Sequence, residues 1–229
     1  MKQNNIMKKE IANIIINSGS IMMAVIFAFV LLEPSIGFGS TNTVSQTVTT
    51  ELAFVTPATN IVLSPSIDVS VGGQASGGTQ VAVITNDHLG YSMTVTASSS
   101  LGMIGNASST LYIPAYVTSS PGTPDFTFTT PANTAYYGYT VEASTTSDLA
   151  TAFRDSAGVC GAVGGSDTAD RCWIAASTTG YTAINRASVT SLSGATTTLK
   201  FLVVINANPN PGIPNDTYVA TTTLTATAN

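Results

Sequence analysis

Charged residues are what this sequence has least of. Lys, Arg, Asp and Glu make up 8% of its 229 residues, against roughly a quarter of an ordinary soluble domain. Seven residues are basic, and only four of them follow position 39. Nucleic acids and anionic membrane surfaces are bound through basic patches. The sequence therefore argues against both as partners.

Side chains for catalysis and for metal binding are also scarce. The chain has one histidine, His88, and two cysteines. A hydroxyl nucleophile needs an adjacent base, but His88 lies beside Asp87 in a predicted hairpin turn, which favours a solvated turn residue. One histidine and two cysteines leave too few ligands for zinc. No Gly-rich loop leads into a Lys-bearing helix, which excludes a phosphate loop. Because none of these catalytic arrangements is found in the sequence, we expect no enzyme activity.

The first 39 residues have the organisation of a secretory signal peptide. Three lysines fall within the first nine positions, and Ile21–Leu32 (IMMAVIFAFVLL) is an uninterrupted apolar run of 12 residues. This length fits the roughly 7–15 residues of a signal peptide and is short of the ~20 that span a bilayer. Pro34 would end the helix. Small residues at Gly37 and Gly39 predict cleavage after Gly39.

An uncleaved anchor is the alternative, with the helix extended back to Ile11. Four polar residues interrupt that extension, namely Asn13, Asn17, Ser18 and Ser20. Cleavage leaves residues 40–229, which carry four basic and ten acidic residues, a net charge of −6. We expect this mature chain to be secreted or held at the cell surface. Contact with the membrane is expected only through the signal segment, before that segment is cleaved off.

Alternation of apolar and polar residues at period two dominates residues 40–229 and predicts strands. Residues 200–205 (KFLVVI) form a nearly continuous apolar run, as expected of a central strand. About ten short strands with Gly- and Pro-rich turns predict an all-β fold with one domain, an Ig-like antiparallel β-sandwich. A barrel is the alternative. Alternation is seen in residues 41–55, 67–71, 81–83, 91–97, 111–113, 126–128, 137–141 and 218–226.

A long excursion from the sheet is predicted at about residues 145–185, where Gly and Asp are frequent. It contains Cys160 and Cys172, 12 positions apart. In an oxidising compartment two such cysteines form a disulfide, which would add about 3 kcal/mol of stability in the chain-entropy model. Two free thiols are the alternative if the compartment is reducing. The best helical signal, over residues 147–154, also falls here and supports only a turn or two.

Two groups of side chains in and near this excursion are candidate ligand contacts. Five aromatic residues would form a stacking platform for sugars, although burial in the core explains them better. Two acids in GGSDTADR (164–171) would bind Ca²⁺ together with nearby Ser and Gly oxygens; a plain acidic loop is favoured instead. No other cofactor is expected. The aromatic residues are Tyr136, Tyr137, Tyr139, Trp173 and Tyr181, and the acids are Asp167 and Asp170.

Two stretches resemble bacterial exported surface proteins. They are VAVITNDHLGYSMTVTASSS (81–100), a strand, turn and Thr-rich return strand, and the ending PNDTYVATTTLTATAN (214–229). The pattern is similar to WxL-type cell-wall proteins, spore-coat-U-like proteins and pilin-like sandwiches. This resemblance implies an Ig-like sandwich at the cell surface, often in assemblies. The chain departs from the WxL signature at Trp173, where the sequence is W-I-A, which puts peptidoglycan binding by that route in doubt.

Two functions fit these features. The first is a structural subunit of a surface layer, coat or filament that assembles with itself or with other surface proteins. Its leading segment, Thr41–Val55, would pair with an edge strand of a neighbouring subunit or complete its own sheet. The second is a module for cell-wall polysaccharide binding or adhesion, with the excursion as its contact surface.

Overall fold

Antiparallel strands account for nearly all the regular structure of this chain. The computed structural model describes residue 43 and residues 45–229, of which residues 48–229 form one compact unit. The strands are β1 (Leu52–Thr56), β2 (Gly73–Thr85), β3 (Tyr91–Ala97), β4 (Gly102–Gly105), β5 (Tyr112–Pro114), β6 (Ala135–Ala143), β7 (Asp155–Ser156), β8 (Val159–Cys160), β9 (Tyr181–Arg186), β10 (Ala195–Ile205), β11 (Tyr218–Val219) and β12 (Thr222–Ala228).

The predicted signal segment lies outside the described residues. This applies to the apolar run Ile21–Leu32 and to the cleavage site after Gly39. In the part of the chain that is described, no helix has the length and apolar character needed to cross a membrane.

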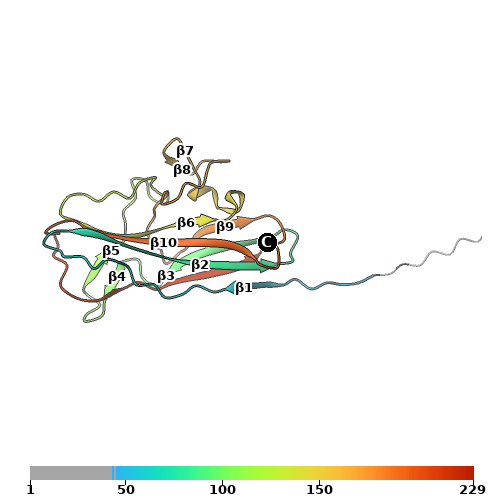
Figure 1. Ribbon diagram of the computed structural model, residues 1–229, viewed down its shortest axis with the longest axis horizontal. Coiled ribbons are helices and arrows are strands. Elements are labelled where there is room, and N and C mark those ends of the chain that lie inside the picture. The colour runs from blue at the N-terminus through green and yellow to red at the C-terminus, as the bar shows by residue number, and fades with distance from the viewer. Residues whose placement is uncertain (1–42, 44) are drawn as a thin grey trace, which may run out of the picture. The chain divides into compact units, whose positions relative to one another are not determined.

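The largest sheet, sheet A, has the strand order β1-β2-β10-β6 (Figure 1). Its centre is β10, which pairs antiparallel with β2 from Ala195 to Ile205 and with β6 from Thr197 to Ile205. Alternate residues of β10 are buried, and those between them are half-buried. The prediction of a central strand at 200–205 is therefore confirmed. The buried apolar residues of β10 are Leu199, Phe201, Val203 and Ile205.

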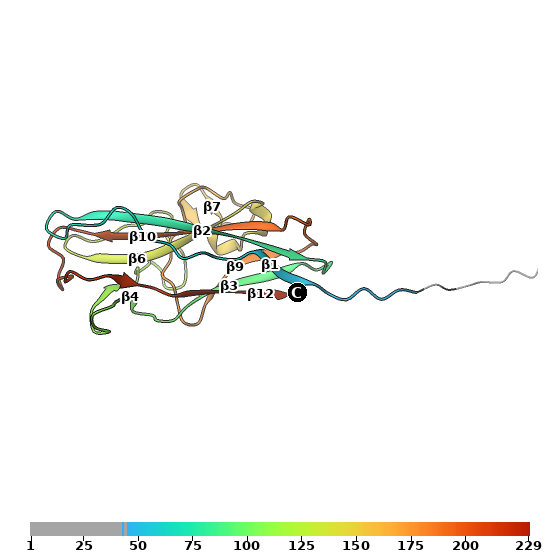
Figure 2. The ribbon, with the colours of Figure 1, turned by 60° about the horizontal axis from the view of Figure 1, so that its bottom comes forward.

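A second sheet, sheet B, has the order β12-β3-β9, and a third, sheet C, has the order β11-β4-β5. In β3 the side chains of Tyr91, Met93 and Val95 are fully buried. They belong to the same hydrophobic cluster as Val83 and Tyr139 of sheet A. Figure 2 shows the strands of both sheets extending along one direction. The all-β prediction is confirmed, with antiparallel sheets contributing to one core.

The strand predicted over Thr41–Val55 is much shorter in the structure. β1 covers only Leu52–Thr56, and residues 45–51 form no strand. Its partner β2 ends at Thr85, so no strand extends beside the preceding residues. The Asn86 side chain instead accepts a hydrogen bond from Glu51 N (2.6 Å) and donates one to Thr49 O (2.8 Å).

Two other predicted strands, 67–71 and 126–128, are absent from the described secondary structure. Ile67, Val69 and Phe126 are partly buried against the core but belong to no ladder between strands. In the first segment the chain turns, because Gly72 N donates to Asp68 O (2.8 Å). Alternation arises here from extended chain that covers the core without pairing.

Candidate functional site

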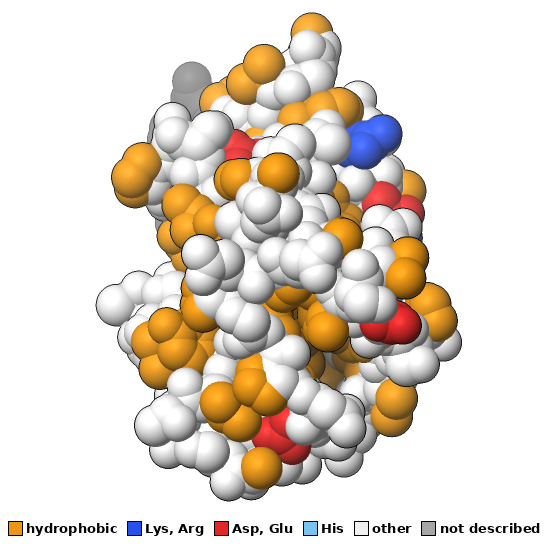
Figure 3. Space-filling view, turned by 90° about the vertical axis from the view of Figure 1, so that its left-hand side faces the viewer, with side chains coloured by type: hydrophobic (Ala, Val, Ile, Leu, Met, Phe, Trp, Pro, Cys, Tyr) orange, Lys and Arg blue, Asp and Glu red, His pale blue; other side chains and the backbone are white. Residues whose placement is uncertain are grey.

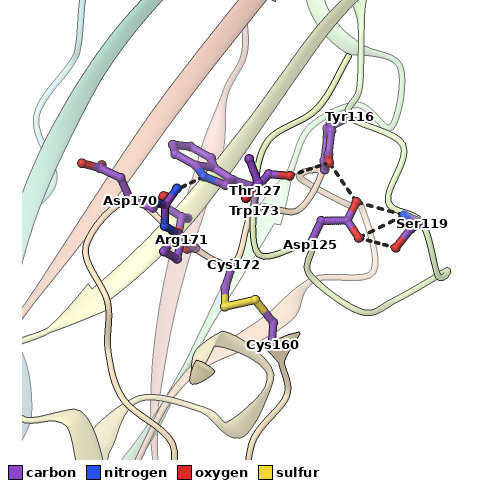
Figure 4. Close-up of a disulfide and its surroundings, with 10 residues drawn as sticks. Tyr116, Ser119, Asp125, Thr127, Cys160, Asp170, Arg171, Cys172 and Trp173 are labelled. Carbon is purple, nitrogen blue, oxygen red and sulfur yellow. Dashed lines mark hydrogen bonds between the residues drawn. A yellow bond between two sulfur atoms is a disulfide. The ribbon is translucent and has the colours of Figure 1, made fainter. Parts of the chain in front are cut away.

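A disulfide joins Cys160 and Cys172, whose Cα atoms are 5.6 Å apart, as predicted (Figure 4). It staples an excursion that contains the hairpin β7–β8 and two short 3-10 helices, η1 (Thr146–Asp148) and η2 (Thr151–Phe153). Leu149 and Phe153, at the predicted helical turns, are buried. The predicted end at about 185 is wrong, because Tyr181 begins β9, a strand of sheet B.

The excursion covers the outer edge of sheet A, which is formed by β6. Ile174 and Tyr139 of β6 exchange two backbone hydrogen bonds, of 2.8 and 2.9 Å. Next to them, Trp173 exchanges two with Asp125, of 2.7 and 2.9 Å. The Trp173 indole donates to Asp170 O at 3.0 Å. The backbone of β6 is therefore covered where the excursion crosses it.

The five aromatic residues predicted as ligand contacts differ in how deeply they are buried. Tyr137, Tyr139 and Trp173 are at most 5% exposed, and the two tyrosines belong to the core cluster. Burial raises the pKa of the Tyr137 and Tyr139 hydroxyls. Tyr136 and Tyr181 are half-buried. The structure thus does not bring the five residues together as one exposed platform.

A different aromatic group covers the outer face of β6. Tyr116 stacks on Phe128 with ring centroids 4.2 Å apart, and Tyr136 meets Tyr116 edge to face at 6.1 Å. Gly138 permits this approach, since a Cβ there would lie 2.9 Å from Phe128 and from the Ile174 carbonyl oxygen. Sequence reasoning missed the group. The available signal was Gly138, a glycine among the tyrosines of a strongly predicted strand.

Asp125 organises the loop beside these rings (Figure 4). Its carboxylate accepts hydrogen bonds from the Tyr116 hydroxyl (2.8 Å), from Ser119 N (2.9 Å) and from Ser119 Oγ (2.5 Å). Burial raises the pKa of Tyr116, and the hydrogen bond and charge of Asp125 add to that rise. Both carboxylate oxygens of Asp125 therefore accept hydrogen bonds within this loop.

The two acids predicted to bind calcium have different partners. Asp167 Oδ2 accepts a hydrogen bond from Ala143 N at 2.8 Å, and burial raises its pKa. Asp170 lies 3.0 Å from Lys200 Nζ, and Glu142 lies 2.8 Å from the same atom. Burial alone would lower the pKa of Lys200, but hydrogen bonds to both acids and their charges raise it. Within the described residues, no group of three or more His, Cys, Asp or Glu side chains is placed to hold a metal ion.

Neither the histidine nor a shallow surface depression beside the 208–214 loop brings catalytic groups together. His88 is 87% exposed and lies 3.6 Å from Asp87. The depression, of about 470 Å³, is lined by apolar and small polar residues only: Val69, Ser70, Asn208, Pro209, Gly212, Ile213 and Pro214. Figure 3 shows one face of the molecule, on which uncharged side chains predominate.

One side of the molecule presents two strand edges. β1 ends sheet A and β12 ends sheet B. The two strands lie close together (Figure 2), with no ladder between them. Leu52, Phe54 and Leu224 are half-buried there against the core. This pair of edges, named here the β1/β12 side, offers backbone hydrogen-bonding groups to a further strand.

Comparison with known proteins adds no relative to this description. No protein-family model matches the chain, and no curated protein matches it.

Proposed function

We propose that this chain is an exported structural protein of the cell surface, an Ig-like β-sandwich that serves as a subunit of a layer, coat or filament. The observation that carries the proposal is the β1/β12 side. Strand edges pair readily with other chains, and soluble proteins usually cover or charge them. In a protein that assembles by strand pairing, an uncovered edge supplies the contact between subunits.

The segment before β1 supports assembly. Residues 45–51 form no strand, and their side chains are exposed. The sequence from Thr43 to Thr50 (TVSQTVTT) is rich in β-branched residues and has no charge, which favours an extended strand. Pairing of this segment with an edge of a neighbouring subunit would link copies without any change in the described fold.

The surface composition fits an exported protein of this kind. Hydroxyl side chains replace charges along the exposed rows of the strands; in β12 these are Thr223, Thr225 and Thr227. The disulfide also fits an oxidising compartment. Export is tested by the mass of the protein isolated from producing cells. A chain that begins at Ser40 and is accessible to protease on intact cells supports the proposal, whereas a full-length chain inside the cell contradicts it.

Assembly is tested by sedimentation of the chain from Ser40 to Asn229 at rising concentration. Growth of species larger than the monomer is expected. A single monomeric species up to millimolar concentration would remove the structural proposal.

Binding of cell-wall polysaccharide, or adhesion through it, is a second candidate function. It is favoured by the half-buried rings of Tyr136 and Phe128 beside Tyr116, because partly exposed aromatic faces stack on sugars. In a pulldown with purified cell walls, Tyr136→Ala should release the protein while Tyr112→Ala, an exposed tyrosine on β5, should not. Equal retention of both variants would reject this site.

A further inference from the structure

The outward edge of β12 follows from its register with β3. Ser98 N donates to Thr221 O (3.0 Å), and Asn229 N donates to Gly90 O (3.3 Å). In an antiparallel ladder the hydrogen-bonded positions alternate, so between these two pairs the residues facing β3 are Thr223, Thr225 and Thr227. The backbone N–H and C=O groups that point away from β3 are those of Thr222, Leu224, Ala226 and Ala228.

Other long strand edges among the described residues are covered or interrupted. Residues Ala115 and Ile174 bridge to the outer edge of β6, and Leu149 bridges to β9. β1 is only five residues long, with an irregular register before Thr56 and Pro57 directly after it. β5 and β11 have three and two residues. Bulges, prolines and short lengths all discourage strand addition, which leaves β12.

β12 itself has none of these protections. It is seven residues long and pairs with β3 without a register shift. From Thr217 to Asn229 the sequence has no charged residue and no proline. The rest of the mature chain is acidic, so two copies repel each other through their net charge. This repulsion is weakest where the neutral surface of one copy contacts the same neutral surface of the other. A two-fold contact places each residue opposite its own counterpart or a near neighbour, and β12 brings no like charges together.

We propose that β12 pairs antiparallel with β12 of a second copy. With Thr225 opposite Thr225 on the two-fold axis, the outward groups of Thr222 meet those of Ala228, and Leu224 meets Ala226. Sheet B then continues across the contact as one sheet. The partner is thus a second copy of this chain, and the contact rests on the proposed function, for which it supplies a symmetric building block.

The size of the contact sets its strength. β12 contributes seven residues, against the roughly 20–30 residues on each side of a standard stable interface. The dimer is therefore expected to form reversibly at high protein concentration, as on a crowded cell surface. A closed two-fold contact makes pairs only, so a layer or filament needs a second contact that does not use β12.

The test compares Thr225→Lys with Thr182→Lys by light scattering after gel filtration over a concentration series. Thr225 and Thr182 both pair with Thr94 and are both exposed, so they share one row of sheet B. Only position 225 lies on the proposed axis. Like charges opposite each other in a sheet repel, so T225K should raise the dimer dissociation constant about fivefold or more, whereas T182K should leave it unchanged.

Mixing provides the check against damage to the fold. At one protein concentration T225K and Thr225→Glu should each form less dimer than the wild type, and their equimolar mixture should regain the dimer through opposite charges on the axis. A T225K variant that dimerises like the wild type overturns the β12 contact, as does a mixture that stays monomeric. If the wild type forms ordered assemblies that T225K leaves intact, this contact is rejected and the proposed function is kept. If the wild type forms dimers but no larger assembly, this contact is kept and the proposed function is rejected.

Discussion

Two buried tyrosine hydroxyls differ at the scale of single residues. Tyr139 Oη is buried without a hydrogen-bond partner among the described residues, whereas Tyr116 Oη donates to Asp125 at 2.8 Å. A buried polar group without a partner costs about 1–3 kcal/mol. We predict that Tyr139→Phe leaves the free energy of unfolding unchanged or raises it, and that Tyr116→Phe lowers it by about 1–2 kcal/mol. Urea unfolding measures both, and the reverse order would contradict the structure.

Buried tyrosines also predict how stability depends on alkaline pH. Burial, followed by the charge of Asp148, raises the pKa of Tyr91 to about 12, and burial raises the pKa of Tyr137 and Tyr139 as well. The raised pKa means that folding favours the neutral phenol. Stability is therefore unaffected by these groups below about pH 10, where an unfolded tyrosine titrates, and falls as the pH rises from there to 12.

The measurement is the urea midpoint across pH 8 to 12, with tyrosinate absorbance followed in parallel. A midpoint that stays constant to pH 12 would show that the buried phenols are not shielded as described.

At the scale of elements, the fit of the aromatic group on β6 depends on Gly138. An added Cβ would lie 2.9 Å from the Ile174 oxygen and from Phe128. We predict that Gly138→Ala destabilises the fold by about 1–3 kcal/mol through overpacking. Gly212→Ala is the matched control, because nothing lies within 4 Å of a Cβ at that site. Equal melting temperatures for the two variants would contradict this packing.

The disulfide is the covalent element of the excursion. Reduction of Cys160–Cys172 should lower stability by about 3 kcal/mol, since the loop spans 12 positions and its closure restricts the unfolded chain. The double variant C160A/C172A should show the same loss and no response to reductant. Thermal unfolding with and without reductant measures both; an unchanged melting temperature on reduction would contradict this role.

Period-two alternation predicts the strands that have partners in a ladder and bury one row of side chains. β3 and β10 match because their alternate residues face the core. The same pattern misleads at Ile67–Val71, where extended chain covers the core without pairing. The disulfide was predictable because two cysteines allow only one pairing. Tyr116 and Phe128 were not, because their contact depends on how a loop crosses the sheet at Gly138.

At the scale of the whole molecule, the distribution of charge and of strand edges supports a surface subunit. Four basic residues follow position 39. Three of the four lie in or beside the excursion and β9, and the fourth, Lys200, is paired with two acids on sheet A. The β1/β12 side is left neutral along β12, which is where contact between like-charged copies is least opposed.

Electron microscopy of two forms of the purified protein, Ser40–Asn229 and Thr49–Asn229, tests the central claim most directly. The shorter form keeps β1, the hydrogen bond from Asn86 to Thr49 O and the one from Glu51 N to Asn86, so its fold should be intact by circular dichroism. We predict that the longer form makes ordered filaments or sheets and that the shorter form stops at pairs or monomers. If both forms remain monomeric at high concentration, the chain is not an assembling surface subunit.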